Sequence, residues 1–371
     1  NYLISNLNLS EIFYITRIEG HPFLWYVLPK FFKFLPYPIS IQLLNWIISS
    51  ILILFVWKKA PFNNLIKFLI TFSYPFFLYF GVVARPYGLT ALSIFLLCYF
   101  YNKKLNRPIL YSFLIVFASN TTIMGLIGAF CFGLIFLAEI IQNYNKSDKK
   151  VKNASLKAFL VLISGVIFII LQFIYPKMPP ARPVEYIEAF KMSAMSFIFN
   201  PFSGTIFQIF FKISFLILFY STIFVLFKKD KKALFFFLSS YIILTFLFLK
   251  IYVGSFWHYF FYFIFLISAF WVSFDKIKNV KFLNYAFILF LIFSINPFCY
   301  FEKGYSETLD TKYYPKMFNA IKKNEEYKNS KLFCLDWFSS FSGGIVPYLQ
   351  KENIKIYDVE GFDRTSFNSI V

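Results

Sequence analysis

Long apolar runs recur along the chain, and short lysine-rich breaks separate them. Each run has about the length that an α-helix needs to cross ~30 Å of hydrocarbon. With 59% hydrophobic and only 15% charged residues, the chain carries more apolar surface than a soluble fold can cover. The sequence therefore predicts an all-α polytopic membrane protein.

The apolar runs predict about ten membrane-spanning helices in a bundle that covers residues 39–298. The fourth run is short, and the connection at 176–205 is the longest between spans. The expected spans are 40–57, 65–82, 86–101, 108–119, 123–141, 158–175, 206–227, 233–250, 256–274 and 282–298.

Two regions outside these spans are more polar. Residues 1–38 predict an external loop with short interfacial helices, and residues 299–371 predict a small soluble domain. Strand-like runs at 331–335 and 355–359 in the second region flank a Gly pair and a helical stretch, so we expect a small α/β unit. A Gly pair alone indicates a turn and carries no chemistry.

Basic residues are concentrated in every second turn between the spans. Because basic residues favour the cytoplasmic side, these turns predict which end of the bundle is cytoplasmic. The N-terminal loop, the loop at 176–205 and the C-terminal region then lie on the external side of the membrane. The lysine-rich turns are 58–67, 103–107, 146–157, 228–232 and 276–281.

The net charge of +19 does not indicate a nucleic-acid partner, because the basic residues form no single stripe. Anionic lipid headgroups explain them better. The chain also predicts no metal or redox motif, since its cysteines show no paired spacing. The cysteines are Cys98, Cys131, Cys299 and Cys334.

Glu19 and His21 form the first candidate site, just before Pro22 and an aromatic stretch. A carboxylate and an imidazole at this spacing suit a general base or a pair of metal ligands. The alternative is a polar loop that caps an interfacial helix, with Pro22 in its first turn. Spacing alone leaves both interpretations open.

Other polar residues are expected at the same external end. Arg85 and Tyr87 open the third span, and an arginine there suits phosphate binding or simply reaches the lipid headgroups. His258 opens the ninth span between two aromatic residues, which an interfacial belt would also explain. The turn at 120–122 reads Asn-Thr-Thr and predicts a helix cap.

The loop at 176–205 contains Arg182 and Glu185, followed by further charged residues. Loops of this length often cover a substrate site, and we expect these two residues to contact substrate if this loop does so. A charged amphipathic helix on the membrane surface is an equal alternative.

Taken together, these motifs resemble the GT-C membrane glycosyltransferases, in the bacterial branch related to protein O-mannosyltransferases and aminoarabinose transferases. Residues 19–26 read Glu-Gly-His-Pro-Phe-Leu-Trp-Tyr, similar to the family's His-Pro-Pro-Leu loop. Residues 84–87 resemble its external Arg-x-Tyr motif, and residues 257–259 resemble its late His-Tyr helix start. The resemblance extends from residue 1 to about residue 275.

The resemblance implies transfer of a sugar from a polyprenyl-phosphate-linked donor to a lipid, glycan or protein acceptor. It also implies a location in the bacterial cytoplasmic membrane, with the active face outside the cytoplasm. It assigns the donor phosphate to Arg85, Tyr87 and His258, and acceptor activation to Glu19 and His21. No metal is assigned, although some relatives use a divalent ion. The family's catalytic Asp and first span are not found in residues 1–38, so we expect both upstream of Asn1. There are two alternatives. Either Glu11 or Glu19 has replaced the Asp as the base, or the protein is inactive.

Two other functions compete with this interpretation. A transporter, flippase or polymerase of lipid-linked saccharide would need polar or Gly/Pro-broken helices at mid-membrane, whereas the span interiors here are mainly Phe, Leu and Ile. A non-catalytic membrane scaffold with an external tail is the second alternative.

Overall fold

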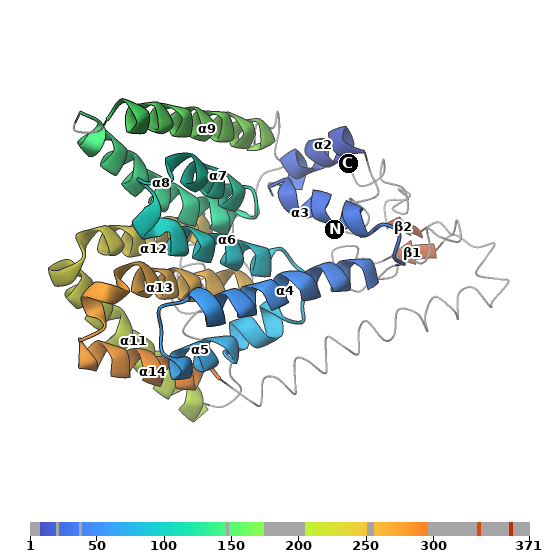
Figure 1. Ribbon diagram of the computed structural model, residues 1–371. Coiled ribbons are helices and arrows are strands. Elements are labelled where there is room, and N and C mark those ends of the chain that lie inside the picture. The colour runs from blue at the N-terminus through green and yellow to red at the C-terminus, as the bar shows by residue number, and fades with distance from the viewer. Residues whose placement is uncertain are drawn as a thin grey trace.

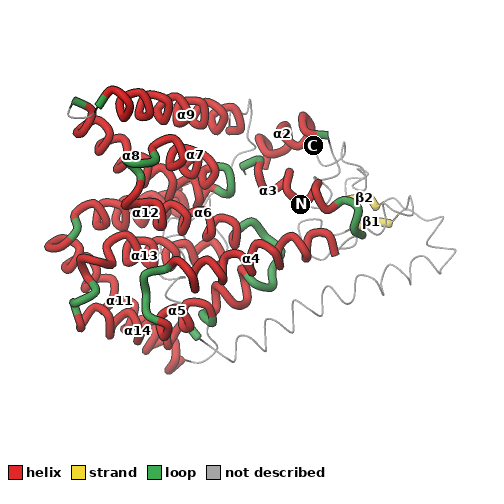
Figure 2. The backbone as a smooth tube through the Cα atoms, in the orientation of Figure 1, coloured by secondary structure: helices red, strands yellow, loops and turns green. Residues whose placement is uncertain are grey.

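The computed structural model describes residues 8–19, 22–36, 39–145, 148–173, 205–250, 256–295, 332–334 and 356–358. Nearly all of the longer stretches are helical, and Figure 1 and Figure 2 show the helices packed lengthwise as a bundle. The main helices are α4 (Ile39–Lys59), α6 (Tyr87–Phe100), α7 (Pro108–Ser119), α8 (Ile123–Tyr144), α9 (Lys149–Phe173), α11 (Thr205–Lys229), α12 (Lys231–Lys250), α13 (Phe256–Ile277) and α14 (Lys281–Ser294).

Five helices are long and apolar enough to cross a membrane, namely α4, α8, α9, α12 and α13. The prediction of a helical membrane protein is confirmed in this form. Ten crossings stay a prediction, because α6, α7 and α14 are shorter. The bounds of α7 nevertheless coincide with the expected span at 108–119.

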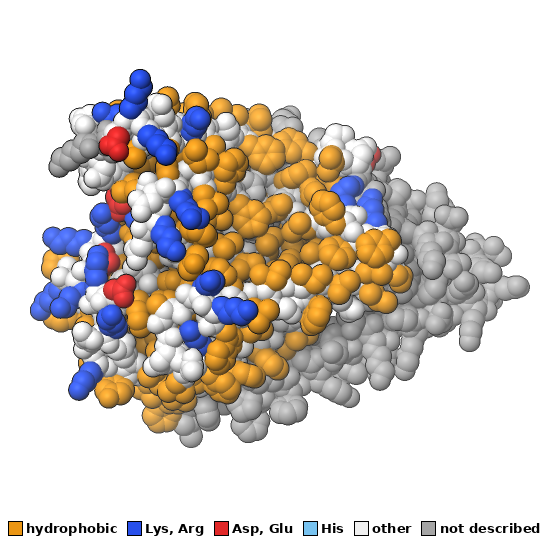
Figure 3. All heavy atoms as spheres, in the orientation of Figure 1, with side chains coloured by type: hydrophobic (Ala, Val, Ile, Leu, Met, Phe, Trp, Pro, Cys, Tyr) orange, Lys and Arg blue, Asp and Glu red, His pale blue; other side chains and the backbone are white. Residues whose placement is uncertain are grey.

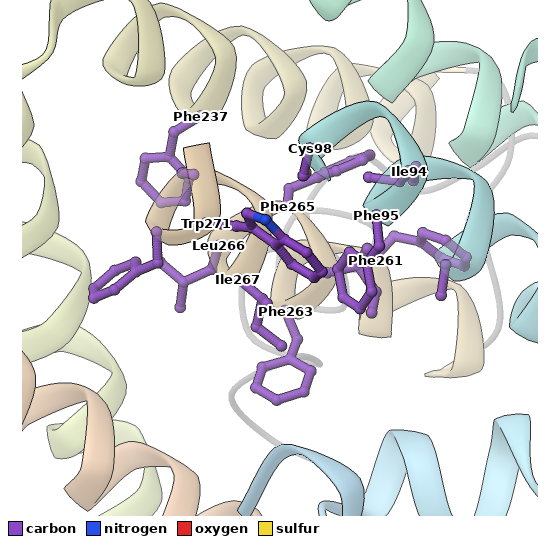
Figure 4. Packing of buried hydrophobic residues seen from close by; sticks show 14 of the residues in the cluster. Ile94, Phe95, Cys98, Phe237, Phe261, Phe263, Phe265, Leu266, Ile267 and Trp271 are labelled. Atoms are coloured by element: carbon purple, nitrogen blue, oxygen red, sulfur yellow. The ribbon is translucent and has the colours of Figure 1, made fainter. Parts of the chain in front are cut away.

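Helix α13 is the centre of the bundle. Every side chain from His258 to Ser273 is buried, as expected for a helix that is apolar on all sides. In Figure 4, Phe265 and Trp271 of α13 lie among Phe95 of α6 and Phe237 of α12. This central position holds the start of α13 at a fixed place relative to the starts of the neighbouring helices.

Helix α9 lies at the edge of the bundle, with only 22% of its most apolar window buried. It packs on α7 at very short range, because Gly165 faces Val116: a Cβ atom built on Gly165 would lie 2.2 Å from the Val116 Cγ2 atom. The rest of α9 presents apolar side chains outward, which suits contact with lipid.

The expected second span, 65–82, is not one continuous helix. It is divided into α5 (Asn64–Thr71) and a π-helix, η2 (Pro75–Phe80). Pro75 has no N–H to continue the ladder of α5, which explains why the helix stops before it. Asn45 and Ser49 of α4 donate hydrogen bonds to the carbonyl oxygen of Phe80, so this end of η2 is satisfied from α4.

The N-terminal region contains α2 (Leu9–Glu19), α3 (Leu24–Val27) and the 3₁₀-helix η1 (Leu28–Phe32). Asn8 and Glu11 cap α2 reciprocally: the Asn8 Oδ1 atom accepts from the Glu11 N–H, and Glu11 Oε2 accepts from the Asn8 N–H. This is a capping box, so Glu11 has a structural role at the start of α2. Helix α2 packs against α9 and α3.

Most of the predicted C-terminal domain lies outside the described residues. Within it, β1 (Leu332–Cys334) pairs in parallel with β2 (Ile356–Asp358), with Leu332 opposite Ile356. Both strands fall inside the two runs that the sequence indicated as strand-like, and a parallel pair needs a crossover between them. The complete α/β unit stays a prediction.

Lysine and arginine side chains gather at one end of the bundle, over the turns that join α8 to α9, α11 to α12 and α13 to α14 (Figure 3). Buried carboxylates hold this end together. Glu139 of α8 forms ion pairs with Lys104 at 3.0 Å and Lys232 at 2.8 Å. Asp230, which also caps α12 by accepting from the Ala233 N–H, binds Lys276 at 2.8 Å.

Candidate functional site

A pocket lies at the other end of the bundle, where α6, α8 and α13 begin. It has about 560 Å³ of empty space, counted to its open mouth. Its lining comes from four places. These are the N-terminal segment, the start of α6, the turn between α7 and α8 with the start of α8, and the region where α12 ends and α13 begins. The lining residues are Pro22, Trp25, Tyr26, Arg85, Pro86, Tyr87, Thr121, Thr122, Ile123, Met124, Leu247 and His258.

Arg85 supplies the positive charge of the pocket. It stands immediately before Pro86, the N-cap residue of α6, and its side chain is exposed. None of the ion pairs among the described residues involves Arg85. A guanidinium at a pocket, with no carboxylate partner among the residues that the structure describes, is well suited to bind an anion such as a phosphate.

Tyr87 and His258 meet inside the pocket. The Tyr87 hydroxyl lies 2.9 Å from Nε2 of His258, and the two rings are nearly perpendicular at a centroid separation of 5.4 Å. Both side chains are buried. Tyr87 is the first residue of α6 and His258 is in the first turn of α13, so the packing of these two helices creates the pair.

Hydroxyl groups form the next wall. Thr122 is the N-cap of α8, where its Oγ1 atom accepts from the Gly125 N–H, as the sequence predicts for this turn. The same oxygen lies 3.1 Å from Oγ1 of Thr90 in α6. Thr121 lines the pocket beside it. These groups give the pocket polar atoms among its lining residues.

The aromatic wall comes from the N-terminal segment. Trp25 and Tyr26 belong to α3 and are almost fully buried. Trp25 packs with Leu44 and Ile48 of α4, whereas Tyr26 packs with Ile12 of α2. Each ring is therefore fixed by a different helix, which gives the pocket a rigid apolar side.

Gln172 of α9 is a structural residue of the site that sequence reasoning missed. Its Oε1 atom accepts from the Phe23 N–H at 2.8 Å, and its Nε2 donates to Oδ1 of Asn120 at 2.8 Å. The Leu24 N–H also donates to the Asn120 carbonyl oxygen. Gln172 thus ties the segment that carries Trp25 to the turn that carries the threonines. A buried amide at the end of an apolar run is the signal that would have found it.

The other predicted site residues are placed less fully. His21, Arg182 and Glu185 lie outside the described residues, and of Glu19 only the backbone, the last residue of α2, is described. Pro22, which follows His21 directly, lines the pocket. Within the described part of the chain, no three His, Cys, Asp or Glu residues are grouped so as to hold a metal ion.

The fold is that of a helical membrane protein, and its candidate site is a pocket at the end of the bundle away from the lysine-rich turns. Comparisons of the chain with models of known protein families, with curated proteins and with solved structures gave no match.

Proposed function

We propose that this protein is a membrane glycosyltransferase of the GT-C kind, which transfers a sugar from a polyprenyl-phosphate-linked donor to an acceptor at the pocket. The observation that carries the proposal is the meeting of Arg85, Tyr87 and His258 around one pocket. His258 is 171 residues from Tyr87 in the sequence, whereas Arg85 and Tyr87 are close neighbours, and the resemblance to the GT-C enzymes assigns the same three residues to the donor phosphate.

The chemistry of such a transfer is an in-line displacement at the anomeric carbon. The acceptor oxygen forms the new C–O bond and loses its proton to a base, while the bond to the phosphate oxygen breaks and both of its electrons leave with the lipid phosphate. Arg85 would stabilise the charge that develops on that phosphate. The Tyr87–His258 pair would supply a further hydrogen-bond donor beside it.

The remaining walls suit a sugar. Aromatic rings such as Trp25 and Tyr26 give a flat apolar surface. The hydroxyl oxygens of Thr121 and Thr122, whose protons bond within the protein, would accept hydrogen bonds from a polar ligand. The apolar residues Met124 and Leu247 line the same pocket and would contact the first part of the lipid carrier. Glu19 and His21 stay the candidates within this chain for activating the acceptor.

A turnover assay tests the proposal. The purified protein in lipid nanodiscs is supplied with radiolabelled polyprenyl-phosphate sugars and with lipid, glycan and peptide acceptors, and the release of polyprenyl phosphate is followed. We expect Arg85→Gln to lower turnover by roughly two to three orders of magnitude, as loss of a charge-stabilising donor does. Arg107→Gln, which removes an exposed arginine at the lysine-rich end, is the matched control and keeps full activity. Equal rates in the two variants would remove Arg85 from the site.

A transporter of lipid-linked saccharide is the second candidate, and the division of residues 64–80 into α5 and η2 favours it. Broken helices are typical of transporters, where free backbone groups line the substrate path. Here the side chains of Asn45 and Ser49 donate hydrogen bonds to the carbonyl oxygen of Phe80, so this oxygen is not available to a substrate. Movement of a fluorescent polyprenyl-phosphate lipid between leaflets of a proteoliposome, without any sugar transfer, would decide for the transporter.

A further inference from the structure

Two lysines from different segments lie against the ring of Tyr99 at the lysine-rich end. The Lys59 ammonium is 5.5 Å from the centre of the ring, and the Lys103 ammonium is 5.0 Å from it. Lys59 ends α4, Tyr99 lies in the last turn of α6, and Lys103 ends the 3₁₀-helix η3 (Tyr101–Lys103). Cation–π attraction therefore gathers two positive charges at one aromatic side chain.

These two charges differ from Lys104, Lys232 and Lys276 at the same end, which form ion pairs with Glu139 or Asp230. In the part of the chain that the structure describes, no carboxylate lies within ion-pair distance of Lys59 or Lys103. Like charges that are held together repel each other, and an anion beside them relieves the repulsion.

The surface below the two lysines is apolar. Ile51, Phe55 and Lys59 follow one another at four-residue spacing on one face of α4, because residues four apart are neighbours on a helix. Ile51 is 48% exposed, and the Phe55 ring packs edge-on against Tyr99. A cationic group at the end of a partly exposed apolar stripe matches the chemistry of a phospholipid, whose phosphate sits above its acyl chains.

We propose that Lys59 and Lys103, held by Tyr99, bind the phosphate of an anionic phospholipid, whose acyl chain lies along Ile51 and Phe55. The ligand is a membrane lipid and not the substrate of the pocket, which lies at the other end of α6. The two sites are independent, so this proposal stands or falls without the glycosyltransferase assignment.

Native mass spectrometry of the full chain in detergent tests the lipid site. The protein is titrated with phosphatidylglycerol, with phosphatidylcholine and with inorganic phosphate, and bound adducts are counted. The variant is Lys59→Gln with Lys103→Gln. The matched control is Lys149→Gln with Lys150→Gln, which removes the same charge from exposed positions at the same end. Tyr99→Leu removes the ring, and Tyr99→Phe keeps it.

We expect the native protein to bind phosphatidylglycerol in preference to phosphatidylcholine. The Lys59/Lys103 variant should lose roughly tenfold in affinity for phosphatidylglycerol, and the control variant should keep it, as lysines at a specific headgroup site contribute more than diffuse charge. Tyr99→Leu should weaken binding and Tyr99→Phe should not. Equal losses in the two double variants, an unchanged lipid preference in the first, or binding of inorganic phosphate at the same concentration would each overturn the proposal.

Discussion

The Tyr87 hydroxyl and Nε2 of His258 lie 2.9 Å apart, although 171 residues separate them in the chain. Both residues stand in the first turn of a helix, and both line the pocket that also contains Arg85. The position of each ring is therefore fixed by a helix that is buried deep in the bundle. This relation makes the pair a direct target for mutation.

Tyr87→Phe removes the hydroxyl and keeps the ring. We expect the free energy of unfolding to fall by about 1 kcal/mol, the net contribution of a typical hydrogen bond. Affinity for polyprenyl phosphate should fall as well, because His258 loses a partner that orients it. Thermal unfolding and a lipid titration in nanodiscs measure both effects. Tyr220→Phe, at a hydroxyl on the exposed surface of α11, should change neither; if both variants behave alike, the pair has no role in the site.

Gln172→Met keeps the size of the side chain and removes both of its hydrogen bonds to other segments. The Phe23 N–H and the Asn120 side-chain oxygen then lose a partner in a poorly hydrated place. We expect a loss of about 2 kcal/mol in stability, typical of a buried polar group left unsatisfied. The pocket should also loosen, since this residue joins two of its walls.

Differential scanning fluorimetry and polyprenyl-phosphate titration test this prediction. The control is Gln142→Met on the exposed face of α8, which should stay within about 0.5 kcal/mol of the native protein. A Gln172→Met variant with native stability and native ligand affinity would show that the hydrogen bonds of Gln172 do not support the pocket.

Gly165→Ala tests the contact between α7 and α9. The added Cβ atom would overlap the Val116 side chain, so the helices must separate, and overpacking of this kind costs about 1–3 kcal/mol. Val116→Ala in the same chain makes room for it. We expect the double variant to be more stable than Gly165→Ala alone, as thermal unfolding of the purified proteins will show. Additive losses would mean that the two residues do not meet.

Lys104 predicts a pH dependence of stability. Burial lowers the pKa of its ammonium group below the ordinary value of 10.5, although the hydrogen bond and charge of Glu139 act to raise the pKa. Between the lowered folded-state pKa and 10.5, the unfolded chain binds more protons than the folded chain. The free energy of unfolding attributable to Lys104 therefore rises with pH across this window.

Lys104→Met removes that titration and keeps a long apolar side chain. The stability of the native protein relative to this variant should increase as the pH is raised toward 10.5, and unfolding curves at several alkaline pH values measure the difference. A difference that stays constant or decreases with pH would contradict the burial of a charged Lys104.

Hydropathy predicts the helices well where a proline or a cap marks the ends. Helix α7 begins at Pro108 and stops before the turn at 120–122, as expected from the sequence. The break before Pro75 was not predicted, because the residues on both sides of it are as apolar as those of a continuous span. At this position the missing N–H of Pro75 interrupts the helix, even though the hydropathy of the segment suits one continuous span.

For the site, topology and the resemblance together indicate that Arg85, Tyr87 and His258 share one end of the bundle. Neither gives the contact between Tyr87 and His258, which depends on how α6 packs against α13. The hydrogen bonds of Gln172 to the two pocket segments were not predicted for a similar reason. Its partners are a backbone N–H and an amide oxygen in two distant segments, and no local pattern in α9 identifies them.

The most direct test of the central claim is to map where the lipid carrier binds. A polyprenyl phosphate with a photoreactive diazirine next to the phosphate is crosslinked to the full chain in nanodiscs, and the labelled peptides are sequenced. We predict labels around Trp25, Tyr87 and Met124, with a large loss of labelling in Arg85→Gln and none in Arg107→Gln. Labelling confined to the lysine-rich end, or labelling that Arg85→Gln leaves unchanged, would contradict the account.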